Sequence, residues 1–541
     1  MPLLPLLTIM LPLLGAGGTL GLSLLPRARS YARYVALTAV GITTILILAL
    51  RWMEPVTVVP SLWQPSLLFG ATLVLQSDAV MQPLAFALAL VTCCAILVDL
   101  SCTDEPHPRL TAASQALLAA GLVALWSANL LTMLISWTIY DLLQAAGHLV
   151  AGNPARMAVR SLIFGGLATL FLWGGALLAG GGASSELWSL MAVSDAQLAL
   201  WAVAGILRLW AYPFHLVVPD DLDTVPFRVA PLVLGPVVGW GLWFRLVLVN
   251  NGSMPGGTWI PIIAAGNLVI GGFLAWTCAS VRRSLSWIGV GAIGAVLLAA
   301  GLAGARAVAV VATGGVAWVL AVGVIFLSDG FRREAPWWSI PALAGTLVLL
   351  GLPLTLGFVT GATLLGGLTR GSPLGWGSAF FFGNLFLIPS LVRRLLSVPS
   401  SAPPQHRWPV VARGIGMGLP MLPLVVAGLY PPLLVGGVRI PALGSLFVMP
   451  GLTGWLLWVV SLAGGGVLAW QGGTIRPKIE LWLSVIHDLL CLEWLYDAVV
   501  GALSRGLSVL RAADEVVGGR GALLWSWLLF LLLILLVWGS K

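Results

Sequence analysis

Charged residues are scarce in this sequence. Of its 541 residues only 9% are Asp, Glu, Lys or Arg, whereas 59% are hydrophobic, and the mean hydropathy is +1.02. In a soluble domain about a quarter of the residues are charged, so the composition excludes a soluble globular protein. It predicts an all-α, polytopic membrane protein, because helices satisfy their own backbone hydrogen bonds inside a bilayer.

Cysteines are also few, and none are spaced as metal ligands. The adjacent Cys93 and Cys94 lie in an apolar run, and no CxxC pair occurs among the five cysteines. We therefore expect no metal site and no disulfide framework. The net charge of +8 fits basic cytoplasmic loops, and no basic stripe alternates with aromatic residues, so nucleic acid is not an expected partner.

Motifs of soluble enzymes are missing as well. The sequence contains no phosphate-binding P-loop, no dinucleotide GxGxxG after a strand, no HExxH and no GxSxG. It also contains no flavin, iron–sulfur or quinone motif. We expect no catalytic residue and no cofactor in this chain, so any redox chemistry would reside in other chains.

Long apolar runs fill the sequence instead. About sixteen of them approach the roughly 20 residues that a bilayer requires. The expected spans cover approximately 2–25, 32–51, 79–99, 111–126, 129–151, 159–180, 196–212, 227–249, 258–279, 285–304, 307–327, 338–364, 375–396, 410–437, 442–470 and 521–539. Between the second and third, alternating apolar residues predict a short hairpin outside the bilayer.

Arginines fall mainly in every second connection, after the odd-numbered spans. Because basic loops stay in the cytoplasm, we expect the N-terminus outside and the chain in a bacterial or archaeal inner membrane. The N-terminal stretch lacks a basic n-region and is expected to be a first span.

An amphipathic segment, roughly 478–518, precedes the last span. If wholly helical it would be about 60 Å long, and we expect it along the membrane surface or against partner helices. Two shorter helices with a kink near Gly501 are the alternative.

The seventh span is interrupted and carries charge. Arg208 lies near the end of its apolar run, Pro213 breaks it, and His215 sits in the break. Pro219 and Asp220 follow before the next run. Irregular backbone at membrane depth survives only where protein or a water-filled cavity satisfies it, and an ionisable residue there indicates a functional site.

The fifth span carries a second group of polar residues. Thr138, Asp141, Ala145 and His148 are spaced to share one face of a helix. A carboxylate and an imidazole two turns apart could pass a proton through water. The alternatives are hydrogen bonds from Asp141 and His148 to neighbouring helices, or a structural pair between Asp141 and Arg208.

Several motifs, in order, resemble the antiporter-like membrane subunits of complex I (NADH-quinone oxidoreductase) and of Mrp-type cation/proton antiporters. The similar segments are Asn129 to Trp137, Tyr212 to His215 with Pro219-Asp220, Gly239 to Arg245, Arg282 to Trp287 with Gly294, Gly351-Leu352-Pro353 with Gly357-Phe358, and Cys491 to Asp497. The last segment is most similar to the largest (L-type) subunit of the family.

The resemblance implies two inverted five-helix repeats, each with a broken helix. Pro213 and Pro219 would break the first, and Pro353 and Gly357 the second. The expected regions are an N-terminal three-helix part (1–100), two antiporter-like repeats (101–250 and 251–397), additional spans (398–472), and the lateral segment with a terminal span (473–541). The implied partners are other membrane subunits and the lipid bilayer, and the implied activity is proton transport coupled to electron transfer.

The chain departs from the family pattern at charged positions. Thr138 stands where the family has glutamate, Arg208 where it has lysine, and Leu232 near its histidine. The eleventh span has no charged residue or histidine, and the twelfth-span lysine position falls near Gly361. We therefore expect a reduced or lost proton path. An Mrp-type antiporter or proton-driven bicarbonate-uptake subunit, and a non-conducting scaffold, are the alternatives.

Overall fold

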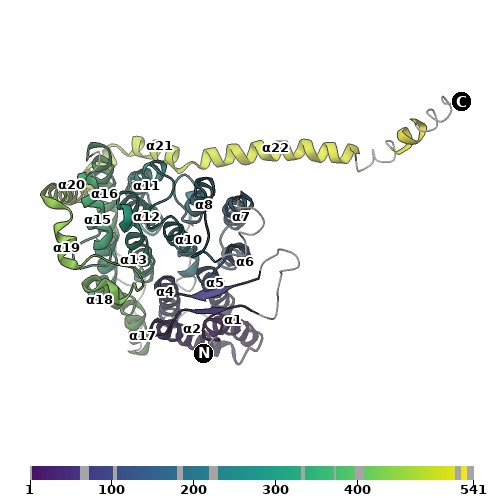
Figure 1. Cartoon of the computed structure of the whole chain (residues 1–541), viewed down its shortest axis with the longest axis horizontal. Helices are drawn as coiled ribbons and strands as arrows, with labels where there is room; N and C mark the ends of the chain where they lie inside the picture. The colour runs from purple at the N-terminus through teal and green to yellow at the C-terminus, as the bar shows by residue number, and fades with distance from the viewer. Residues whose placement is uncertain are drawn as a thin grey trace. The chain divides into compact units, whose positions relative to one another are not determined.

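The structure, a computed structural model, describes residues 3–60, 72–101, 107–178, 187–217, 230–329, 336–370, 373–396, 407–517 and 526–532. The chain divides into two compact units, Met1–Ile479 and Glu480–Lys541. The first unit is a bundle of helices (Figure 1), so the predicted all-α membrane fold is confirmed.

The helices of the first unit are α1 (Leu4–Ser23), α2 (Ala32–Ala49), α4 (Gln82–Leu100), α5 (Pro108–Trp126), α6 (Leu130–Val150), α7 (Ala155–Leu178), α8 (Asp195–Arg208), α9 (Ala230–Val233), α10 (Val237–Val249), α11 (Trp259–Thr277), α12 (Ser284–Leu302), α13 (Ala307–Leu327), α14 (Ile340–Leu349), α15 (Phe358–Arg370), α16 (Pro373–Leu396), α17 (Arg407–Gly418), α18 (Met421–Leu429), α19 (Leu443–Val448) and α20 (Gly451–Lys478). Twelve helices of the described chain are long and apolar enough to cross a membrane. The interrupted α8, α9–α10 and α14–α15 fall short of that length, so the count of about sixteen spans stays a prediction.

The predicted hairpin is confirmed. Strands β1 (Val56–Val58) and β2 (Leu75–Ser77) pair antiparallel, with Val56 opposite Ser77. The side chain of Asn129, at the start of α6, donates to the carbonyl oxygen of Thr72 (2.8 Å), beside this hairpin. We call this end of the bundle the hairpin face.

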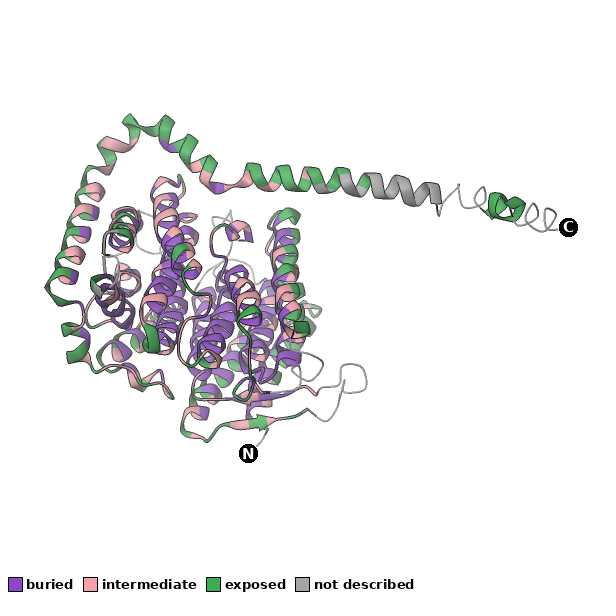
Figure 2. Cartoon of the chain, turned by 45° about the horizontal axis from the view of Figure 1, so that its top comes forward, coloured by how far each residue is buried: buried purple, intermediate pink, exposed green. Residues whose placement is uncertain are grey.

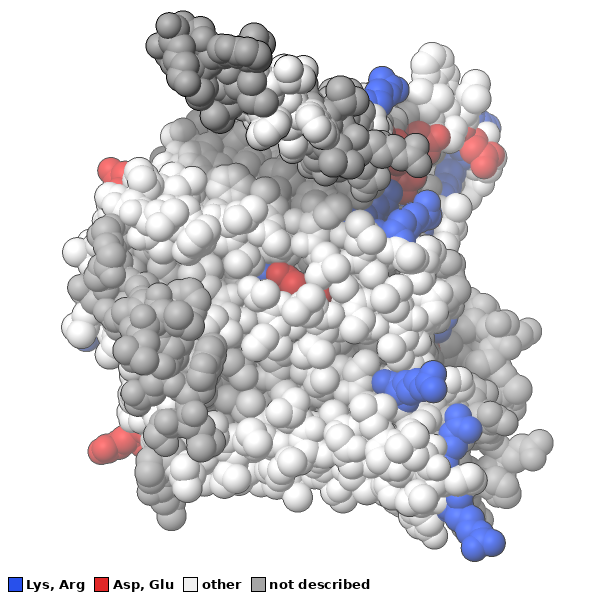
Figure 3. Space-filling view, turned by 90° about the vertical axis from the view of Figure 1, so that its right-hand side faces the viewer, with Lys and Arg blue, Asp and Glu red and all other residues white. Residues whose placement is uncertain are grey.

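Burial explains why some helices are apolar on every side. Nearly every residue of α13 is buried, and so are most residues of α4. A helix that is hydrophobic all round has to be buried in this way. Figure 2 shows the buried residues in the middle of the bundle, with exposed positions on peripheral helices. Figure 3 shows one side of the molecule as a broad and mostly uncharged surface, as a bilayer requires.

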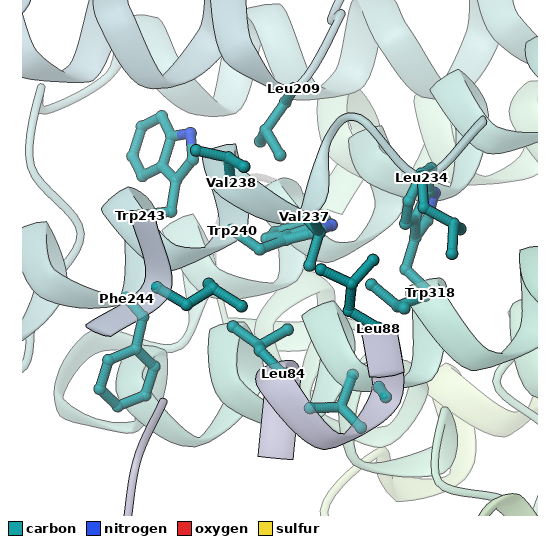
Figure 4. Close-up of a cluster of buried hydrophobic side chains, with 14 of the residues drawn as sticks. Leu84, Leu88, Leu209, Leu234, Val237, Val238, Trp240, Trp243, Phe244 and Trp318 are labelled. Atoms are coloured by element: carbon teal, nitrogen blue, oxygen red, sulfur yellow. The ribbon is translucent and has the colours of Figure 1, made fainter. Parts of the chain in front are cut away.

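The centre of the bundle is an aliphatic and aromatic cluster (Figure 4). Leu84 and Leu88 of α4 lie on the side of Trp240 of α10, Trp243 of α10 lies toward Leu209 beyond the end of α8, and Trp318 of α13 belongs to the same cluster. Each of these side chains is buried. This packing fixes α10 against α4 and α13, and so fixes one wall of the first predicted repeat.

In the second unit, α21 (Glu480–Cys491) and α22 (Glu493–Val517) are separated at Leu492, whose φ is +55°. The alternative of two helices is confirmed, but the predicted kink near Gly501 is wrong, because α22 runs through that residue. A left-handed backbone conformation at Leu492 ends the first helix instead. Residues 526–532, within the last predicted span, include a further helical stretch.

Candidate functional site

An ion pair between α6 and α8 is the centre of the first predicted repeat. α8 begins with a capping box at Ser194 and Gln197 and ends at Arg208. The Arg208 guanidinium binds both carboxylate oxygens of Asp141, with Nη2 donating to Oδ2 at 2.7 Å. The two side chains are 5% and 6% exposed. A two-pronged Arg–carboxylate contact is among the strongest side-chain hydrogen bonds, so the two charges neutralise each other inside the bundle.

Side chains and backbone of α6 and α7 surround this ion pair and provide further contacts for Arg208. The Arg208 guanidinium lies over the Trp137 ring, 4.3 Å from its centroid. Its Nη2 also donates to Thr169 Oγ1 (3.3 Å) and the Gly165 carbonyl (3.5 Å), both on α7. A Cβ at Gly165 would overlap the Asp141 carboxylate. Glycine is therefore required for α7 to approach the pair.

Helix α8 ends directly after Arg208, and the following residues are irregular. Trp210 takes a φ of +55°, and Pro213 lies in the turn that follows. Asn267 of α11 holds this turn, since its Oδ1 accepts from the Tyr212 amide (2.6 Å) and its Nδ2 donates to the Tyr212 carbonyl (3.3 Å). Asn267 belongs to the other predicted repeat, so sequence reasoning did not find it.

His215 starts the 3₁₀ helix η3 (His215–Val217) and is buried. Its ring stacks on Tyr212 at 5.1 Å between centroids and meets Trp287 of α12 at 4.7 Å. His215 thus lies among aromatic rings, whereas Asp141 binds Arg208. Pro219 and Asp220 fall outside the described residues.

A buried polar stripe runs along α6. Ser136, Tyr140, Gln144 and His148 recur every fourth residue and are all buried. His148 Nδ1 is 3.0 Å from the Asn153 side-chain amide. The Tyr140 hydroxyl, Gln144 Nε2 and His148 Nε2 have no hydrogen-bond partner in the described part of the chain. Tyr140 and Gln144 were not identified as candidate site residues from the sequence, although their spacing of four residues from one another and from His148 predicts a shared helix face.

Thr138 lies outside this stripe. It is exposed, and its hydroxyl donates to the Leu134 carbonyl of its own helix (3.0 Å). The predicted common face of Thr138, Asp141 and His148 is therefore buried at the last two residues but not at Thr138. A step of three residues turns a helix about 300°, which places Thr138 at the edge of the buried stripe.

Buried polar atoms without protein partners concentrate in the first predicted repeat. Within 101–250 of the described chain they belong to Ser114, Gln115, Trp126, Trp137, Tyr140, Gln144, His148, Asn153, Ser161, Trp188, Arg208, Trp240 and Trp243. Within 251–397 of the described chain, Ser286 and Thr360 carry such atoms. Buried polar groups in native proteins bind protein or internal water. Among the described residues, the region of the first predicted repeat (101–250) is therefore the part of the bundle whose chemistry suits internal water.

The second predicted repeat is also interrupted, but without charge at the break. α14 ends at Leu349 and α15 begins at Phe358, with Pro353 and Gly357 between them. Gly361 packs on Gly351, where a Cβ would lie 2.7 Å from the carbonyl oxygen. A cavity of about 40 Å³ at this break is lined mainly by small and apolar residues, with Thr360 and Asn384 as its polar side chains.

The ion pair of the second predicted repeat lies elsewhere. Arg394, in the last turn of α16, binds Asp329, just beyond the end of α13. This pair therefore joins helix ends and does not reach the interrupted span. Charge in the interior of an interrupted span is thus a feature of the first repeat in the described structure.

Solved membrane complexes share this fold. A chain of the Mrp complex from Dietzia superposes with a TM-score of 0.81 at 17% identity, covering 99% of this chain and 63% of that one. A chain of the membrane-bound sulfane sulfur reductase, an archaeal respiratory complex, gives 0.72 at 18% identity, covering 98% and 99%. Respiratory complex I from Thermus thermophilus gives 0.58 at 19% identity, covering 79% and 98%.

Curated sequences agree with this likeness, although no protein-family model matches the chain. NADH-quinone oxidoreductase subunit N of Parafrankia is 28% identical over 277 residues, or 43% of this chain and 51% of that protein. The subunit 2 of a Synechococcus NAD(P)H-quinone oxidoreductase is 25% identical over 279 residues, or 47% and 50%. In sequence the chain thus resembles antiporter-like membrane subunits of complex I, and it shares the fold of the solved membrane complexes.

This likeness is broader than any one subunit type. The chain spans about half the length of the curated relatives above. Those relatives are named subunit N or subunit 2, so the placement of this antiporter-like subunit nearest the largest subunit stays a prediction. The implied division into repeats likewise stays a prediction.

Proposed function

We propose that this antiporter-like subunit works in a complex I-type NADH-quinone oxidoreductase, or a related membrane oxidoreductase, beside other membrane subunits. In that setting it takes part in proton translocation through its first repeat alone. The observation that carries this proposal is the Asp141–Arg208 pair, set among buried polar atoms that protein does not satisfy. The apolar break of the second repeat supports the restriction to the first.

The route follows the α6 stripe. His148 lies toward one end of the helix, and Gln144 and Tyr140 lie one and two turns nearer its middle, beside Asp141. Because arginine stays protonated in proteins, Asp141 is the member of the pair that takes up a proton. Neutral Asp141 would release Arg208 to its other acceptors, Thr169 and the Gly165 carbonyl. Opening and closing of the pair would thus accompany each proton.

Proton translocation by the assembled complex tests this route. Inverted membrane vesicles with Asp141→Asn or Gln144→Leu should acidify about tenfold more slowly, since a positioned proton acceptor or its water contact is lost. Thr360→Val, a buried polar position of the second repeat, is the matched control and should leave the rate unchanged. Unchanged rates in the first two variants would favour a non-conducting scaffold.

A second candidate is an Mrp-type cation/proton antiporter subunit. It is favoured by the likeness to the Mrp complex chain, which extends over 99% of this chain. Purification of the tagged chain in mild detergent separates the two candidates. Co-purification of flavin or iron–sulfur subunits supports the oxidoreductase, and sodium/proton exchange without them supports the antiporter.

We also propose that the N-terminus lies outside and the hairpin face points outward. Arg393 and Arg476 gather at the opposite end of the bundle, on the carbonyls of Thr277, Cys278 and Ala279. That arginine-rich end fits the cytoplasmic side. An N-terminal epitope should be reached by antibody on intact cells after outer-layer permeabilisation; detection only in inverted vesicles would reverse the orientation.

A further inference from the structure

A cavity of about 520 Å³ opens at the hairpin face of the first repeat. Its wall comes from β2, the start of α4, the α5–α6 connection, the segment before α8 and the end of α10. Its polar lining includes Gln76, Asp78, Ser127, Ser189, Arg245 and Asn251. Asp141 and Arg208 are not part of this lining, so the cavity is separate from the site described above.

Arg245 is the buried charge of this cavity. It lies in the last turns of α10 and is 5% exposed. Its Nη2 donates to the Leu125 carbonyl at the end of α5 (2.6 Å), and its Nη1 reaches the Gly241 carbonyl at 3.4 Å. A guanidinium carries five N–H donors, so two carbonyls leave most of its hydrogen-bonding capacity to the cavity.

Asp78 is the other charge on the wall, and it is bound differently. It is half-buried, and its Oδ1 accepts from the amides of Val80 (3.0 Å) and Met81 (2.7 Å), where α4 starts. In the described structure it forms no ion pair with Arg245. The carboxylate is thus held at a helix N-terminus, whose dipole favours negative charge, while the guanidinium keeps its own charge toward the cavity.

The depth of the two charges decides which ions enter. A polar cavity of this size holds on the order of ten waters or more, at roughly 30 Å³ each. Asp78 is nearer the surface, where solvent screens its field, whereas Arg245 is buried, where a charge acts more strongly on an approaching ion. A metal cation that reaches the buried end therefore meets a fixed positive charge.

We propose that this cavity is a water-filled mouth of the first repeat and that Arg245 is its selectivity residue, which keeps metal cations out. Asp78 at the rim offers its carboxylate to a proton, and the discrimination against metal cations lies with Arg245 deeper in the cavity. The role in proton transport rests on the proposed function. The exclusion of cations is a property of the cavity itself and is measured without transport.

Two introduced cysteines test the mouth in vesicles that contain the full complex. Val249→Cys lies one turn from Arg245 on α10 and is half-buried in the lining, and Ser189→Cys lies at the exposed rim. Each is labelled with an anionic or a cationic methanethiosulfonate, both membrane-impermeant, from one side at a time. The parent chain gives the background: Cys93, Cys94, Cys278 and Cys491 are buried, and Cys102, which lies outside the described residues, is replaced by Ser in the parent and in every variant.

Both cysteines should react from the same side only. Relative to a small thiol in solution, Val249→Cys should favour the anionic reagent about fivefold, and Ser189→Cys should show a smaller preference. Adding Arg245→Gln should reverse the preference at position 249, because Asp78 remains, and Asp78→Asn should increase it. Arg245→Lys keeps the charge and should keep the preference, which controls for damage to the fold.

Either of two results overturns the proposal. One is a Val249→Cys that no reagent reaches from either side. The other is a reagent preference that neither Arg245→Gln nor Asp78→Asn changes. If the expected labelling is found while the first-repeat variants leave proton translocation intact, the mouth stands and the proposed function fails.

Discussion

At the residue scale, the ion pair of Asp141 and Arg208 depends on an uncharged neighbour. Gly165 faces the carboxylate so closely that no other side chain fits. Its carbonyl also lies 3.5 Å from Arg208 Nη2. The approach of α7 thus closes the pair from one side, and the Trp137 ring closes it from another.

Gly165→Ala should therefore disturb the pair without changing any charge. The added methyl overlaps Asp141, and overpacking of this kind typically costs about 1–3 kcal/mol. Thermal unfolding of the detergent-solubilised complex should show the loss. Gly166→Ala is the matched control, because a Cβ there meets nothing within 4 Å. Equal melting temperatures for the two variants would contradict the close packing.

The sequence identified both members of this pair, because charge in apolar spans is conspicuous. It left open whether they bind each other, since partner choice depends on how α6 and α8 pack. The same limit hid Tyr140 and Gln144, which are ordinary polar residues until their burial is known. The exposure of Thr138 was not predicted, because sequence spacing alone does not locate the edge of a buried face.

At the element scale, the break after α8 is held by a side chain from another helix. Asn267 binds both the amide and the carbonyl of Tyr212. Proline and the charged residue predict where such a span stops. The hydrogen bonds that make the stop tolerable come from a helix more than fifty positions away, which no local pattern indicates.

Asn267→Ala should loosen this break. The amide and the carbonyl of Tyr212 would each lose a hydrogen bond, at about 0.5–1.5 kcal/mol for each bond. Hydrogen exchange should rise in 209–217 and stay unchanged in α6. Asn384→Ala is the control, since the Asn384 amide binds the Phe380 carbonyl of its own helix. Protection of 209–217 that survives the first substitution would refute this role.

At the scale of the whole molecule, composition and periodicity sufficed for the membrane fold and the hairpin, because both are set by local residue pattern. The number of spans could not be predicted in this way. Interrupted helices such as α14 and α15 are each too short to cross a membrane alone, so their lengths do not show how many crossings they make. Arginine side chains also connect helices that are far apart in the sequence, and these contacts cannot be predicted without knowing how the helices pack. Arg476 of α20 and Arg393 of α16 bind the same connection after α11.

Arg476→Ala should free the end of α20. This helix is mostly exposed along its length, so the contacts of Arg476 with Thr277 and Cys278 are a large part of what fixes its last turns. Limited proteolysis near 470–479 should become faster, and the complex should stay assembled. Lys478→Ala, two residues further on, should leave cleavage unchanged, and similar cleavage of both variants would argue against the contact.

The nearly complete burial of α13 has a consequence for energy conversion under the proposed function. Its apolar side chains beside the second break leave no charged group at that break among the described residues. Under the proposed function, an assembly that carries this chain moves fewer charges for each pair of electrons than one with charge at both breaks. Since each charge costs about 2.3 kcal/mol per 100 mV, the same redox reaction could continue against a steeper transmembrane voltage before it stalls.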